Sequence, residues 1–86
     1  MLDTIQSLEQ ELNNTDSEIL SQLANQLKEH YRHHYWKIVL IGDEGEYERL
    51  NESINRLITA IDASELNDAK IELATIKTIV KDIYSL

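Results

Sequence analysis

The three histidines are the side chains whose type and spacing come nearest to a chemical site. His30 and His34 stand four residues apart, so on a helix both imidazoles project from one face, with His33 beside them. Two histidines at this spacing can begin a divalent metal site, but such a site needs three or four protein ligands. Glu29 lies one step off that face, and no Glu-x-x-His pair supplies a further ligand. We therefore expect no bound metal or other cofactor, and we keep His30 and His34 only as weak metal candidates.

The other reactive side chains do not form a recognisable catalytic set. The chain has no cysteine, which excludes thiolate nucleophiles, disulfides and cysteine metal sites. The histidines cluster in one segment, and no serine stands on a tight turn between glycines, so a Ser-His-Asp arrangement is not indicated. The sequence predicts that the protein is not an enzyme.

The strongest charge feature is the acidic stretch 43–48. It begins in a loop predicted over residues 42–46, because the only two glycines of the chain, Gly42 and Gly45, stand there. Apolar residues and the only tryptophan come just before it, and an aromatic anchor rimmed by charge is a common design for a binding hot spot. The residues that we predict to bind a partner are Trp36, Val39, Leu40, Asp43, Glu44, Glu46 and Glu48.

Composition indicates how these residues are positioned. The chain has 86 residues, of which 42% are apolar and 28% are charged, as expected for one soluble domain over residues 1–86. It contains no proline and only two glycines, which favours a few helices joined by short polar turns.

Apolar residues recur at helical spacing in four segments, which predict a helix over residues 2–13, a long one ending at Ile41, and two more over 47–61 and 66–83. Residues 35–41 are apolar on all sides and could instead form a strand, but no second strand-like segment is available to pair with them. The sequence predicts an all-α fold, a small antiparallel bundle of three long helices plus a short N-terminal helix.

The last of these segments carries two further expectations. Ser64 is a plausible N-cap for the helix that follows it. Ile71, Thr75 and Ile79 form a second apolar stripe beside the main one, so we expect neighbouring helices to cover this helix on two sides.

Net charge and hydropathy limit the partners and the location. A formal net charge of −8 should repel nucleic acid and anionic membranes and attract basic protein surfaces. The N-terminus lacks the pattern of a signal peptide, and no segment approaches the roughly 18 apolar residues of a membrane span. We expect a cytoplasmic protein that binds neither nucleic acid nor membrane.

These observations predict a small acidic helical module that binds a protein partner. In the simplest case the partner has a basic surface. In size and style it resembles bacterial immunity proteins, antitoxins, secretion co-chaperones and phage-encoded inhibitors. A self-assembling homodimer, with its seam at the apolar end of the second helix, is the alternative. A bundle that binds a metal through its histidines is a second, weaker alternative.

Overall fold

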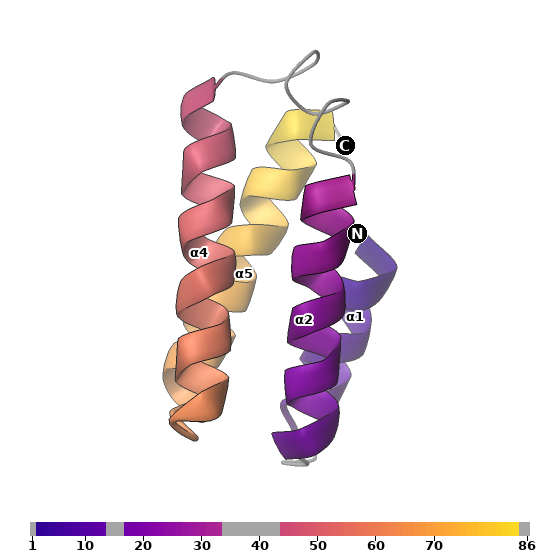
Figure 1. Ribbon diagram of the computed structural model, residues 1–86, viewed down its shortest axis with the longest axis vertical. Coiled ribbons are helices and arrows are strands. Elements are labelled where there is room, and N and C mark those ends of the chain that lie inside the picture. Colours follow the sequence, from indigo (N-terminus) through magenta and orange to yellow (C-terminus); the bar gives the residue numbers. More distant parts are fainter. Residues whose placement is uncertain (1, 14–16, 34–43, 85–86) are drawn as a thin grey trace.

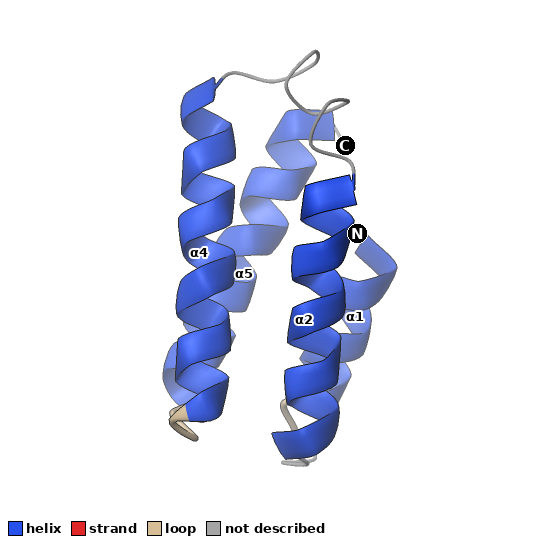
Figure 2. Ribbon diagram, in the orientation of Figure 1, coloured by secondary structure: helices blue, strands red, loops and turns tan. Residues whose placement is uncertain are grey.

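Figure 1 shows the computed structural model of the chain, in which residues 2–13, 17–33 and 44–84 are described. Within them the chain forms four helices, α1 (Leu2–Glu11), α2 (Ser17–His33), α4 (Glu44–Asp62) and α5 (Leu66–Tyr84). Figure 2 shows that these described segments contain no strand. The predicted all-α bundle is confirmed. The expected extension of the second helix to Ile41, and the strand alternative for 35–41, fall outside the described residues.

The helices form an up-and-down bundle in which each packs against the next along the chain (Figure 1). α1 packs on α2, α2 on α4 and α4 on α5, and α5 closes the ring by packing on α1. The bundle measures 36 × 20 × 19 Å, and its longest helices, of 19 residues each, span about 28 Å of that length. Every helix therefore has two neighbours and one side that faces away from both.

The main apolar stripe of each helix points into the ring. Leu27 and Tyr31 of α2 are buried, as are Leu50 and Ile54 of α4. A helix in a four-membered ring buries one stripe about 100° wide, which matches residues spaced three and four apart. The predicted stripe residues that are buried include Ile5, Leu8, Leu12, Leu20, Leu57, Ile61, Ala69, Leu73, Ile76, Val80 and Ile83.

The second stripe of the last helix is not covered as we expected. Ile79 is buried, but Thr75 is exposed and 63% of the surface of Ile71 is exposed. The stripe runs across the boundary between the side of α5 that meets α4 and the side that meets no helix. Only Ile79 lies on the covered side, so the prediction of coverage on two sides is wrong for the other two residues.

The loop predicted over residues 42–46 is also corrected in part. Glu44, Gly45 and Glu46 belong to the first turn of α4, and Gly45 has no positive φ angle. Carboxylates at this end favour the helix because they interact with the exposed N–H groups and the positive end of the dipole. That preference outweighs the roughly 1 kcal/mol by which a helical glycine is less favourable than alanine.

Ser64 ends one helix instead of capping the start of the next. It has a φ angle of 58°, the only positive value at a non-glycine residue in the described part of the chain. Its N–H donates to the Ile61 carbonyl at 3.0 Å, and the Glu65 N–H donates to the Ala60 carbonyl at 2.8 Å. This pair of bonds is the Schellman motif, with Ser64 in the left-handed position that glycine usually fills. The Glu65 carbonyl then accepts the first bond of α5, from Ala69 at 3.0 Å.

Candidate functional site

The predicted metal candidates do not form a complete site in the described structure. His30 is partly buried and His33 is exposed on the outer face of α2, beside Gln26 and Glu29. His34 lies outside the described residues. Among residues 2–13, 17–33 and 44–84, no three histidine, aspartate or glutamate side chains are grouped so that they could hold a metal ion.

The predicted partner patch falls only partly within the described residues. Trp36, Val39, Leu40 and Asp43 lie outside them, and Glu44 begins α4. In the next positions of that helix Glu46 is partly buried and Glu48 is exposed.

An aromatic contact fixes the start of α4 against the end of α2. The rings of Tyr31 and Tyr47 meet edge to face, with centroids 5.7 Å apart and planes at 65°. Both tyrosines are buried, and such a pair contributes about 0.5–1.5 kcal/mol beyond its buried area. The contact holds the acidic turn of α4 at the end of the bundle where α2 finishes.

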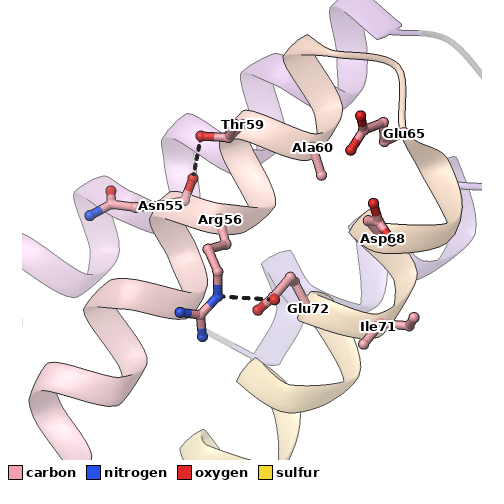
Figure 3. A pocket seen from close by; sticks show the side chains of 8 residues that line it. All are labelled: Asn55, Arg56, Thr59, Ala60, Glu65, Asp68, Ile71 and Glu72. Carbon is pink, nitrogen blue, oxygen red and sulfur yellow. Dashed lines mark hydrogen bonds and ion pairs between the residues drawn. The ribbon is translucent and has the colours of Figure 1, made fainter.

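A groove between α4 and α5 is lined by charged side chains from both helices (Figure 3). Arg56 of α4 organises it, because its Nε donates to Glu72 Oε1 of α5 at 3.0 Å. Its Nη2 donates to Ser53 Oγ at 3.2 Å, and its Nη1 lies 3.7 Å from Glu52 Oε2. The groove is lined by Asn55, Arg56, Thr59, Ala60, Glu65, Asp68, Ile71 and Glu72.

One carboxylate in this groove has unused hydrogen-bonding capacity. Arg56 occupies Oε1 of Glu72, whereas Oε2 is buried and accepts no hydrogen bond. An unsatisfied buried acceptor costs on the order of 1–3 kcal/mol, which a suitable donor would recover. Glu65 and Asp68 line the same groove and make no ion pair with any described residue. The α5 edge of the groove is therefore acidic, with free acceptor capacity at three positions.

Beside the groove runs a low-polarity face that we name the α5 outer strip, made of Ile71, Ala74, Thr75 and Thr78. All four side chains are exposed. The hydroxyl of Thr75 donates to the Ile71 carbonyl at 3.1 Å, and that of Thr78 donates to the Ala74 carbonyl at 3.1 Å. Because both hydroxyls are used by the helix backbone, the threonines add little unsatisfied polarity to the strip.

The opposite edge of the strip is basic. Lys77 pairs with Glu9 of α1 at 3.0 Å, and Lys70 lies with it in a hollow between α5 and α1. Lys81 stands four residues beyond Lys77, on the same side of the helix. Near Ile71 the α5 outer strip thus runs between an acidic edge toward α4 and a basic edge toward α1. Farther along, Ala74, Thr75 and Thr78 line a second hollow with Arg49 and Arg56 of α4, so the edge toward α4 is of mixed charge there.

The sequence contains the signal for this strip, but the same pattern predicts a stripe covered by neighbouring helices. Ile71 and Thr75 stand at helical spacing. Periodicity shows that two residues share a helix face, but it does not show whether a neighbouring helix covers that face. The charge of each edge depends on which helix lies beside it. Arg56, the partner of Glu72, lies on α4, and Glu9, the partner of Lys77, lies on α1.

The fold and this surface define a small acidic all-α bundle of up-and-down topology, with an uncovered strip on its last helix. The chain belongs to the family described as a domain of unknown function, DUF4363, whose model matches residues 1–86. No curated protein matches the chain significantly, and no solved structure does so either. In the described part of the chain, no helix has the length and apolar character needed to cross a membrane.

Proposed function

We propose that this protein works by binding another protein, as a helical interaction module. The observation that carries the proposal is the α5 outer strip, an uncharged helix face that begins at an isoleucine that is 63% exposed. One exposed aliphatic side chain is ordinary on a protein surface. An apolar face bounded by charge along both edges is the arrangement of an interface, where an apolar centre is surrounded by a polar rim.

The charge of the chain supports the same proposal and suggests the kind of partner. The formal net charge of −8 favours association with a basic protein surface and disfavours nucleic acid and anionic lipid. In this proposal the protein is a non-enzymatic cytoplasmic inhibitor, immunity-like protein or chaperone, because each of these covers a surface of its partner. The acidic start of α4, with Glu46 and Glu48, is a second surface that could contribute.

The test is a comparative affinity purification from the native host. The bait is the wild-type chain, the Ile71→Glu variant, or the Glu46→Lys/Glu48→Lys double variant. Ile19→Glu is the control, because Ile19 is the other exposed isoleucine among the described residues. We expect one protein to be recovered in stoichiometric amount with wild type and control, and to be lost from at least one test variant of unchanged helicity. Recovery of no protein, or equal recovery by all four baits, would refute the proposal.

Two alternatives from the sequence are separated by direct measurements. Sedimentation velocity distinguishes the proposed monomeric module from a homodimer, for which the sequence predicts a seam at the apolar end of the second helix. Metal analysis of purified protein distinguishes it from a bundle that binds metal through His30 and His34. A dimer at micromolar concentration, or stoichiometric metal, would favour the corresponding alternative.

A further inference from the structure

We infer that the α5 outer strip binds an amphipathic helix of the partner that carries arginine or lysine along the side facing α4. This inference rests on the proposed function and adds the location of the interface and the chemistry of the ligand. It is carried by the shape of the strip, the acidic edge and the basic edge.

The shape of the strip suits a helix. Its residues form a stripe along α5 at steps of three and four. The stripe is about 10 Å long from Ile71 to Thr78, at 1.5 Å per residue. A helix presents ridges with the same spacing, so two helices can pack with the ridges of one between those of the other. Ala74 is small enough to allow close approach, and Ile71 provides the one large apolar contact. Amphipathic helices bind grooves of this kind through apolar anchors one turn apart.

The acidic edge determines the charge of the bound helix on the side toward α4. Glu65 and Asp68 have no ionic partner among the described residues, and the spare oxygen of Glu72 is buried in the same groove. A guanidinium group has five N–H donors in a fixed planar arrangement and can bind two carboxylate oxygens at once. An arginine next to the apolar seam of the partner helix would place these donors over the groove shown in Figure 3.

The basic edge determines the charge on the other side. Lys70 and Lys81 have no ionic partner in the described part of the chain, whereas Lys77 is held by Glu9. A bound helix with carboxylates on this side would pair with the two free lysines. Two copies of this chain packed antiparallel through their strips would instead bring lysine edge against lysine edge and acidic edge against acidic edge. The charges therefore disfavour an antiparallel self-pair. A parallel self-pair would set the acidic edge against the lysine edge, and concentration-dependent shifts without a peptide would detect it.

The experiment uses a defined probe in place of the unidentified partner. The probe is a synthetic 21-residue helix (about six turns) with a leucine and alanine seam, arginine on one flank and glutamate on the other. A control peptide of equal helicity has glutamate on both flanks. Each peptide is titrated into ¹⁵N-labelled full-length protein, and amide shifts are followed by NMR.

We expect the arginine probe to shift amides around Thr59, Asp68, Ile71 and Thr75, and to bind at least about tenfold more tightly than the control peptide. That ratio corresponds to the loss of one charge-assisted contact. Ile71→Glu and Asp68→Lys should each weaken the probe by a similar factor, whereas Ile19→Glu should not change its affinity.

Three outcomes would overturn the inference: equal binding of both peptides, shifts centred on the first turn of α4, or unchanged affinity of the Ile71→Glu variant. Concentration-dependent shifts of strip residues without a peptide would identify a second copy as the occupant and would also overturn it. Failure here is distinct from failure of the proposed function, because the native partner would still be lost from the Glu46→Lys/Glu48→Lys bait.

Discussion

At the scale of single residues, Ser64 shows how a backbone requirement can override a side-chain preference. Serine is favoured at helix N-caps, yet here the chain reverses through a left-handed residue, and Ser64 occupies that position with φ of 58°. Non-glycine residues in this conformation carry a cost of roughly 1–2 kcal/mol. The α4–α5 turn therefore contains a small, local strain at a residue with an exposed side chain.

Replacing this serine should stabilise the protein. Ser64→Gly relieves the left-handed strain, and part of the gain is offset by the greater freedom of glycine in the unfolded chain. We expect the free energy of unfolding to rise by about 0.5–1 kcal/mol in urea titrations followed by circular dichroism. Ala63→Gly is the matched control, because Ala63 has no positive φ and should lose stability. Equal effects of the two substitutions would contradict the role given to Ser64.

At the scale of helices, α5 has two isoleucines in opposite environments. Ile76 is fully buried in the core, whereas Ile71 is 63% exposed on the outer strip. Both lie in the middle of the same helix, so helix propensity affects them alike. The pair therefore separates the contribution of packing from the contribution of local helix formation.

We expect Ile76→Ala to lower the free energy of unfolding by about 2–4 kcal/mol, because it removes buried methylene groups and leaves a cavity. Ile71→Ala should change it by no more than about 0.5 kcal/mol in either direction. Thermal and urea denaturation of the two variants measure the difference. A large loss from Ile71→Ala would mean that this side chain is covered in solution, contrary to the interface proposed for it.

The helices were largely predictable from the sequence, whereas their boundaries and the candidate site were predictable only in part. Stripes such as Leu50, Ile54 and Leu57 require a buried helix face, and burial confirms them. Glycine usually interrupts helices, so the sequence predicts a loop at Gly45, but acidic neighbours favour a helix start there and Gly45 lies in the first turn of α4. The exposure of the α5 outer strip depends on which two helices flank α5. The sequence of α5 alone does not determine these neighbours, because they follow from how all the helices of the ring pack.

At the scale of the whole molecule, the ring is built mostly from packing between consecutive helices. α1–α2, α2–α4 and α4–α5 are successive pairs of the described helices, and among these helices only the α1–α5 contact joins segments far apart in the chain. Among the described helices, α1 is also the one least able to form in isolation. It has 10 residues, no basic residue in its last turn, and Glu11 at its negatively polarised end. A helix shorter than about 12–15 residues is marginal in isolation, so α1 depends on its packing against α2 and α5.

This dependence has a consequence for the native-state fluctuations of the protein. A short helix that depends on tertiary packing can open in events smaller than global unfolding, and amide hydrogen exchange detects these events. We expect the amides of α1 to exchange at least about tenfold faster than those near Ile54 and Ile76 under native conditions. Lys77→Ala should increase α1 exchange further by removing the ion pair with Glu9, while leaving the α2–α4 amides unchanged. Uniform protection across all four described helices would show that α1 does not open separately from the rest of the bundle. The expected result would instead identify α1, the helix that closes the ring, as the first part of the native structure to open.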